Sequence, residues 1–249
     1  MERIALLDDD MNDNPTDGPR FDSYTETYKE IINRSSRLSG ERYEYFAELR
    51  VKLMQGELAS RTGRNDGFSI LDFGCGIGET ARIMSVLFPA SEVTGIDESG
   101  ESVARAVSLC LPKTAFFTIG EATLPFASER FDAVYSNGTF HHIRWERHAE
   151  VIGEILRSMK HGGYLFIFEN NPRNPLMLRA MKNNPFDTGL AAIPPARLVE
   201  IGRKAGLCHV RTKYYFFFPR ILKALRPLEK LLGRVPFGAQ YYVLFRKAL

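Results

Sequence analysis

The chain has 249 residues, of which 44% are hydrophobic and 25% charged, with a net charge of +3, and this composition excludes a largely disordered or collagen-like chain. No apolar run approaches the roughly 18 residues of a membrane-spanning helix, and the acidic N-terminus lacks the apolar segment of a signal peptide. Three scattered cysteines give no disulfide framework and no metal-ligand spacing, so we expect a reduced, cytoplasmic protein.

The N-terminal part divides into a tail and a helical segment. Residues 1–20 are rich in Asp, Asn, Pro and Gly, and we expect them to form a flexible tail. Aromatic residues and leucines recur at helical spacing over 21–62, which predicts helices broken near Ser39 and Gly40. We expect this segment to be a lid, in which Tyr24 and Tyr28 either cover a site or pack into the core.

Short apolar runs alternate with helical patterns from residue 68 onward. The predicted strands cover 68–73, 92–96, 115–119, 131–136 and 164–169, and the predicted helices cover 79–87, 101–111, 148–159 and 196–205. This alternation predicts an α/β domain with a parallel sheet and helices on both faces. The last apolar runs, 208–218 and 240–246, have no crossover helix between them, so we expect them to pair antiparallel at one end of the sheet.

A glycine-rich loop, Gly-Cys-Gly-Ile-Gly over 74–78, joins the first strand to the following helix. Its glycines let the backbone approach a ligand closely, and the helix N-terminus offers free N–H groups. A dinucleotide fingerprint would need glycine at position 79, where the chain has Glu79, and no phosphate-binding Gly-Lys-Ser/Thr follows. Asp97 ends the second strand, where its carboxylate suits a ribose diol or, alternatively, caps the next helix.

Four motifs in order carry a family resemblance: L-D-F-G-C-G-I-G over 71–78, G-I-D over 95–97, G-E-A-T-L-P-F over 120–126 and F-D-A-V-Y-S-N-G-T-F-H-H over 131–142. This series resembles the class I S-adenosylmethionine-dependent methyltransferases that act on small molecules or lipids. The resemblance implies a Rossmann-like, seven-stranded, mostly parallel sheet with an antiparallel last strand. It implies S-adenosylmethionine as cofactor and S-adenosylhomocysteine as product. The methyltransferase domain would span 21–249, with a helical lid over 21–62 and a cofactor core over 68–169.

The resemblance assigns residues to the methionine end of the cofactor. The loop residues expected to line the methionine moiety are Gly74, Cys75, Gly76 and Gly78. Cys75 would be there only as a small residue, because no basic partner argues for a nucleophilic thiol. Asp72 is expected near the amino group, directly or through water. Asn137 and Phe140, which follow the fourth strand, are expected near the sulfonium.

At the adenosine end, the resemblance implies that Asp97 holds the ribose hydroxyls, with Glu98 or Ser99 beside the adenine. Glu121 stands where the family often has Asp and is expected to accept a hydrogen bond from the adenine amino group. The backbone N–H of Ala122 is expected to meet a ring nitrogen. For Glu121 the alternative is an ordinary solvated glutamate on the surface.

Two adjacent histidines, His141 and His142, follow the fourth strand, on the side where strand ends face the ligand crevice. Either could serve as a general base, because imidazole titrates near neutral pH. The alternative is that they pack or begin a helix. The remaining histidines have no partner pattern, so we expect no metal site.

Asn170, Asn171 and Arg173 lie in a polar turn with two Asn-Pro steps after the fifth strand, followed by a Met/Leu run. This pattern predicts a rigid turn and a short helix over the pocket. The turn could bind substrate, or it could be only a turn, because Asn-Pro favours turn initiation.

The C-terminal segment is basic. Residues 211–249 hold nine Lys or Arg against one acid, Glu229, which gives +8, whereas the 24 basic and 29 acidic residues before it give −5. Within it, the insert over 219–239 interleaves leucines with basic residues, and Pro227 is expected to kink it or begin a second short helix. A basic amphipathic insert suits a membrane surface or an amphiphilic anionic substrate. Alternatively, it is a lid helix that packs its leucines down and solvates its arginines.

These patterns lead to two functional hypotheses. The first is methyl transfer to an O, N or C nucleophile of a small-molecule or lipid-linked acceptor, where alignment contributes most and a base is needed only if the acceptor must lose a proton. The second is a non-catalytic S-adenosylmethionine-binding protein that docks a partner or membrane through its basic C-terminal segment. We expect no nucleic-acid substrate, because no Asn/Asp-Pro-Pro-aromatic motif follows the fourth strand. The sequence favours no particular oligomeric state.

Overall fold

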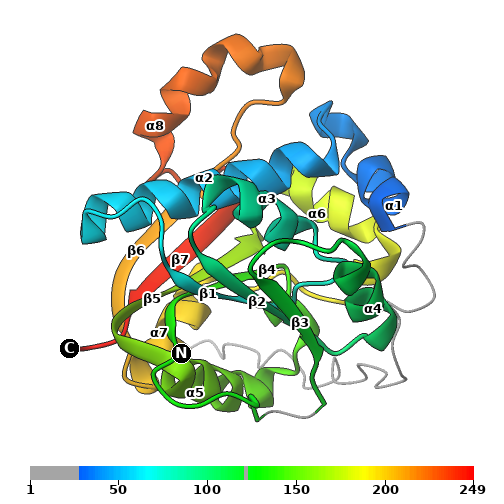
Figure 1. Ribbon diagram of the computed structural model, residues 1–249. Helices are drawn as coiled ribbons and strands as arrows, with labels where there is room; N and C mark the ends of the chain where they lie inside the picture. Colours follow the sequence, from blue (N-terminus) through cyan, green and yellow to red (C-terminus); the bar gives the residue numbers. More distant parts are fainter. Residues whose placement is uncertain (1–27, 121–122) are drawn as a thin grey trace, which may run out of the picture.

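Seven strands form one mixed sheet in the computed structural model, which describes residues 28–120 and 123–249 (Figure 1). The strands are β1 (Ser69–Phe73), β2 (Glu92–Asp97), β3 (Thr114–Thr118), β4 (Phe131–Asn137), β5 (Met159–Asn170), β6 (Cys208–Tyr215) and β7 (Gln240–Arg246). Their order is β3-β2-β1-β4-β5-β7-β6. Neighbours among β1 to β5 pair parallel, and β7 pairs antiparallel with β5 and β6. The predicted Rossmann-like sheet with an antiparallel last strand is confirmed.

Helices cover both faces of this sheet, as the alternating pattern predicts. They are α1 (Tyr28–Ser35), η2 (Arg37–Ser39), α2 (Tyr43–Thr62), α3 (Glu79–Leu87), α4 (Gly100–Ser108), η3 (Phe140–His142), η4 (Trp145–Arg147), α5 (His148–Ser158), α6 (Pro175–Lys182), η5 (Pro185–Asp187), α7 (Pro195–Lys204), η6 (Arg220–Leu228) and α8 (Glu229–Leu232). Successive strand residues face opposite sides, so Ile70 belongs to the buried cluster that includes residues of α2 and α3, whereas Leu71 belongs to the cluster that includes residues of α5 and α7.

The N-terminal helical segment is broken where the sequence predicts, because η2 ends at Ser39 and α2 begins at Tyr43. Helix α2 then packs along one face of the sheet (Figure 1). Its buried apolar residues include Phe46, Val51 and Met54. Tyr24, the predicted tail over 1–20 and the side chain of Tyr28 lie outside what the structure describes. The described part of this segment therefore covers one face of the sheet and contributes buried residues to the core.

Strand β6 ends at Tyr215, three residues before the predicted end at Phe218. The reason is the Glu229 carboxylate, whose Oε2 accepts a hydrogen bond from Phe216 N at 3.1 Å. Its Oε1 accepts from Phe217 N and Phe218 N at 3.0 Å each. These N–H groups are thus bound by a side chain from the insert and are unavailable to a neighbouring strand.

The insert over 219–239 leaves the sheet between β6 and β7 and stands outside the layers, beyond α2 (Figure 1). It consists of η6 and the short helix α8, which begins just after Pro227 as predicted. Among the described residues, no helix is both long and apolar enough to cross a lipid bilayer.

We expect Glu229→Ala to lower the free energy of unfolding by about 1.5–3 kcal/mol, because three backbone N–H groups lose a charged acceptor. Urea unfolding followed by circular dichroism measures this change. The control is Glu200→Ala, which removes an exposed partner of Lys204 and should leave stability nearly unchanged. Equal stabilities of the two variants would show that Glu229 does not hold the end of β6.

Candidate functional site

The residues singled out from the sequence gather at one edge of the sheet. Strands β2, β1 and β4 are parallel neighbours, so their carboxyl ends meet at this edge. The glycine loop follows β1, Asp97 ends β2, and the segment 137–140 follows β4. Ligands of open α/β sheets bind in the crevice outside these strand ends.

Backbone hydrogen bonds tie the glycine loop to the end of β2. Gly74 N and Cys75 N both donate to Ile96 O at 2.9 Å, and Gly76 N donates to Asp97 Oδ2 at 2.8 Å. These bonds hold the loop in place against the end of β2.

Two loop positions require glycine. Gly74 has a φ of 78°, and a Cβ there would collide with the side chain of Thr139, which follows β4. Gly78 has a φ of 81°, and a Cβ would lie 2.9 Å from Ala106 Cβ in α4. Left-handed backbone and close approach both exclude larger residues here. The loop thus packs between the segment after β4 and helix α4.

The Asp97 carboxylate connects the glycine loop to the start of α4. Its Oδ1 accepts from Ser99 N at 3.0 Å and its Oδ2 from Gly76 N at 2.8 Å. The residue that caps the next helix is Ser99 rather than Asp97, because the Ser99 hydroxyl accepts a hydrogen bond from Ser102 N at the start of α4. Glu98 lies next to Asp97 in the chain and is exposed as a whole residue. Its carboxyl is nevertheless partly buried, and this partial burial, followed by repulsion from Asp97, raises its pKa.

Asp72 is a buried carboxyl with an unsatisfied oxygen. Only 1% of the residue is exposed, and within the described residues its Oδ2 has no hydrogen-bond partner. Burial, followed by repulsion from Asp97, raises the pKa of Asp72 to about 8. A cationic amino group placed here would relieve both the burial and the repulsion. The site therefore fits the amino end of S-adenosylmethionine.

The other predicted residues of the cofactor site divide between the crevice and the core. Cys75 is buried, and burial raises the pKa of its thiol well above the usual value, as expected of an unreactive thiol. Phe140 is fully buried, and its ring centre lies 6.1 Å from that of Phe73, so its side chain is part of the core rather than of the crevice surface. Glu121 and Ala122 lie outside the described residues.

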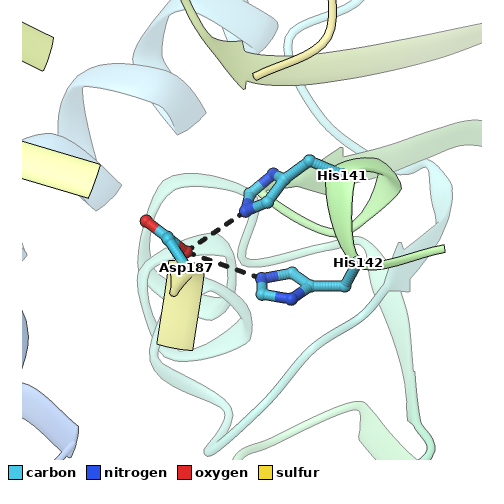
Figure 2. A group of neighbouring side chains, drawn as sticks. All are labelled: His141, His142 and Asp187. Carbon is cyan, nitrogen blue, oxygen red and sulfur yellow. Dashed lines mark hydrogen bonds and ion pairs between the residues drawn. The ribbon is translucent and has the colours of Figure 1, made fainter. Parts of the chain in front are cut away.

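Two carboxylates from distant segments, Glu169 and Asp187, lie beside the adjacent histidines, and Figure 2 shows the contacts with Asp187. His141 Nδ1 lies 2.7 Å from Glu169 Oε2. Its Nε2 lies 3.3 Å from Asp187 Oδ1, and His142 Nε2 lies 3.7 Å from the same oxygen. Burial disfavours charge on His141, but the two carboxylates outweigh burial and raise its pKa to about 10. A histidine protonated at neutral pH cannot act as a general base.

A cavity of about 160 Å³ opens beside these histidines, between α1, α2, η3, α6, η5 and the ends of β5 and β7. Its polar lining includes Arg50, Asn137, His141, His142, Asn170 and Gln240, and its apolar lining includes Phe46, Met177, Met181 and Phe186. Another depression, at the opposite ends of the strands near His161 and Lys247, touches none of these residues.

Only one of the three residues predicted in the turn after β5 lines this cavity. Asn170 lines it, and its Oδ1 accepts from Gln240 Nε2 at 3.1 Å. The side chain of Asn171 is fully buried, and its Nδ2 donates to Pro236 O and Gly238 O, which ties the turn to the insert. Arg173 is exposed and is not part of the cavity lining.

Sequence reasoning missed Arg50, Glu169 and Asp187. Arg50 comes from α2, and its Nη1 donates to Gln240 Oε1 at 3.1 Å. Glu169 is the penultimate residue of β5, the strand next to β4, so the predicted strand order could have placed it near the histidines. Asp187 lies in η5, in a stretch that the sequence analysis assigned to no element, and no sequence signal links it to the site.

The comparison with known families agrees with this geometry, because residues 71–167 match the model of a family described as methyltransferase domain. The chain carries a class I S-adenosylmethionine-dependent methyltransferase domain. The matched range runs from β1 to β5 and thus includes Asp72, Asp97 and both histidines of the site.

Two relatives of this methyltransferase domain are named as methyltransferases of a phytyl hydroquinone and of a sterol. The 2-methyl-6-phytyl-1,4-hydroquinone methyltransferase of Synechocystis sp. is 37% identical over 110 residues, or 43% of this chain and 34% of that protein. The sterol 24-C-methyltransferase erg6 of Schizosaccharomyces pombe is 30% identical over 164 residues, or 57% and 42%. The chain thus spans less than half the length of these two relatives.

A solved structure extends the likeness of the methyltransferase domain to most of the chain. The TehB-like S-adenosylmethionine-dependent methyltransferase from Corynebacterium glutamicum matches with a TM-score of 0.60 at 16% identity, and the match covers 90% of this chain and 98% of that one. At this identity, the likeness shows a shared fold.

We expect the binding of S-adenosylmethionine at pH 7 to release close to one proton from the protein. With a pKa of about 8, Asp72 is mostly protonated before binding, and a neighbouring ammonium group favours its ionised form. Calorimetric titrations in buffers of different ionisation enthalpy measure the number of protons released. Asp72→Asn should abolish the release, and a wild-type protein that releases no more protons than this variant would contradict the assignment.

Proposed function

We propose that the chain transfers a methyl group from S-adenosylmethionine to an oxygen, nitrogen or carbon nucleophile of a small-molecule or lipid-linked acceptor. The observation that carries this proposal is the position of the segment 137–139. Thr139 packs against Gly74 of the cofactor loop, while Asn137 and Gly138 line the cavity. Among the described residues, this short segment therefore contacts both the glycine loop and a cavity with mixed polar and apolar walls.

In this proposal, the protein mainly binds the methyl donor and the acceptor and aligns them with each other. S-adenosylmethionine, when bound, supplies a methyl group activated by a cationic sulfur. Asp72 would hold the amino end and Asp97 the ribose hydroxyls, and Asn137, which lines the cavity, would lie near the sulfonium. Alignment of donor and acceptor can account for about 7–11 kcal/mol of the barrier. If the acceptor must lose a proton, we propose His142 rather than the protonated His141 as the group that accepts it.

The cofactor site is tested by calorimetric binding of S-adenosylmethionine and S-adenosylhomocysteine. We expect Asp97→Ala to weaken both by about 10- to 100-fold, because hydrogen bonds to a charged group are lost. Glu101→Ala, an exposed acid on the adjacent helix α4, should bind like the wild type. Thermal unfolding of each variant checks its fold.

Wild-type protein that is folded but binds neither ligand would overturn the proposed function. Binding without methyl transfer to phenols, quinols, sterols or polyprenyl-linked acceptors would favour the alternative, a non-catalytic protein that binds the cofactor.

We also propose that the insert over 219–239 contacts a membrane surface. The interpretation as a lid that packs its leucines down is wrong, because the apolar side chains of the insert are exposed: Ile221 by 90%, Leu231 by 81% and Phe237 by 65%. Exposed basic residues lie among them: Arg220, Lys223, Lys230 and Arg234. Apolar side chains with a basic surround are typical of helices that lie in the interface of an anionic bilayer.

The insert is held to the domain by other residues, which leaves its apolar side chains free to enter lipid. Arg226 Nη2 donates to Glu41 Oε1 at 2.8 Å, and its guanidinium lies 4.7 Å from the centre of the Tyr45 ring. Glu229 binds the backbone at the end of β6. The anchoring residues and the exposed apolar residues are thus different, which supports a docking arm.

Flotation with vesicles of phosphatidylglycerol and phosphatidylcholine tests membrane contact. We expect wild-type protein to float with anionic vesicles, and salt to weaken this binding. Replacing Ile221 and Leu231 together by Asp should reduce the bound fraction at least tenfold. Val86→Asp, at a position on α3 that is 70% exposed, should bind like the wild type. Equal flotation of all three proteins would contradict a role for the insert.

A further inference from the structure

Three potential metal ligands from two segments of the chain converge beside the cavity (Figure 2). His141 and His142 come from η3, and Asp187 comes from η5. One ligand atom of each lies within 4.8 Å of the other two. We propose that this trio binds a divalent transition-metal ion of the zinc type, which would in turn hold an oxygen atom of the acceptor.

The distances within the trio fit such an ion. Zinc bonds to imidazole nitrogen and carboxylate oxygen are about 2.0–2.2 Å long, which places ligand atoms of a tetrahedral ion about 3.4 Å apart. His141 Nε2 and His142 Nε2 lie 3.3 and 3.7 Å from Asp187 Oδ1. Two histidines and one carboxylate are also the number and kind of ligands that leave a position open in catalytic sites.

Buried partners orient two of the three ligands. Glu169 is 2% exposed, and its Oε2 lies 2.7 Å from His141 Nδ1, which places the ring proton on Nδ1 and turns Nε2 toward the trio. Asp187 Oδ2 accepts from Asn184 Nδ2 at 2.9 Å, which directs Oδ1 toward the histidines. A carboxylate behind a histidine ligand is the usual outer support of a metal site.

The same atoms could instead form a metal-free ion pair, with a protonated His141 between Glu169 and Asp187. The two arrangements differ in what they require of His142. The ion pair needs only His141, whereas a three-ligand site also needs His142. The variant His142→Ala therefore distinguishes them, because it leaves every contact of His141 with the two carboxylates in place.

The position of the trio links it to the proposed function, on which its role toward the acceptor rests. His142 and Asp187 line the cavity together with Asn137. An ion there would face the acceptor and favour one that carries a hydroxyl or carbonyl oxygen. By binding a hydroxyl, the ion would lower its pKa, so that its proton could pass to water. His142, as a ligand of the ion, would then not act as the base.

Direct metal binding tests the proposal without any methyl-transfer assay. Untagged protein is stripped with a chelator, titrated with Zn²⁺ and Co²⁺ by calorimetry, and analysed for bound metal after dialysis. We expect one equivalent with micromolar or tighter affinity, and a visible absorption band of bound Co²⁺. His142→Ala and Asp187→Asn should each weaken binding at least 100-fold, and Glu169→Gln by about 10- to 100-fold.

The matched control is His209→Ala, which removes a histidine on β6 whose Nε2 contacts Thr212 rather than the trio, and it should bind metal like the wild type. Wild-type protein without a stoichiometric ion, or His142→Ala with wild-type affinity, would overturn the site. S-adenosylmethionine binding is measured on the same samples. Loss of metal binding with intact cofactor binding therefore separates failure of this inference from failure of the proposed function.

Discussion

The site depends on the hydrogen bonds that fasten the glycine loop to the end of β2. Because the Ile96 carbonyl accepts from two loop N–H groups and Asp97 accepts from Gly76 N, the loop cannot move independently of the second strand. Its other side is fixed by the approach of Thr139 to Gly74. One short loop thus sets the spacing between the ends of β1, β2 and β4, and the cavity begins on the far side of the β4 segment.

Buried acidic groups give both halves of the site a preference for a positive group. On the cofactor side, Asp72 lies near Asp97, its Oδ2 has no hydrogen-bond partner among the described residues, and burial favours its protonated form. On the acceptor side, Glu169 and Asp187 surround His141, and their charges favour a cation there in spite of burial. Each half is thus suited to a positive group: the amino end of the cofactor on one side, and a proton or the proposed metal ion on the other.

The insert and the cavity are structurally connected. Gln240, the first residue of β7, follows the insert and lines the cavity. On the opposite side, Asn171 binds the carbonyls of Pro236 and Gly238 and so joins the turn after β5 to the insert. If the exposed leucines enter a bilayer as proposed, the cavity lies next to the lipid surface, which agrees with an acceptor that is itself lipid-linked.

The sequence by itself determined the α/β class, most strand and helix positions, the glycine loop and Asp97, because periodicity and motif spacing are local properties of the chain. It placed the end of β6 too late, because the carboxylate of Glu229 that ends the strand comes from another segment. Only the tertiary structure decided that Glu169 and Asp187 meet the histidines, that Arg50 reaches the cavity, and that the leucines of the insert face solvent. Each of these depends on which distant segments pack together, and a pattern of residues along the chain does not contain that information.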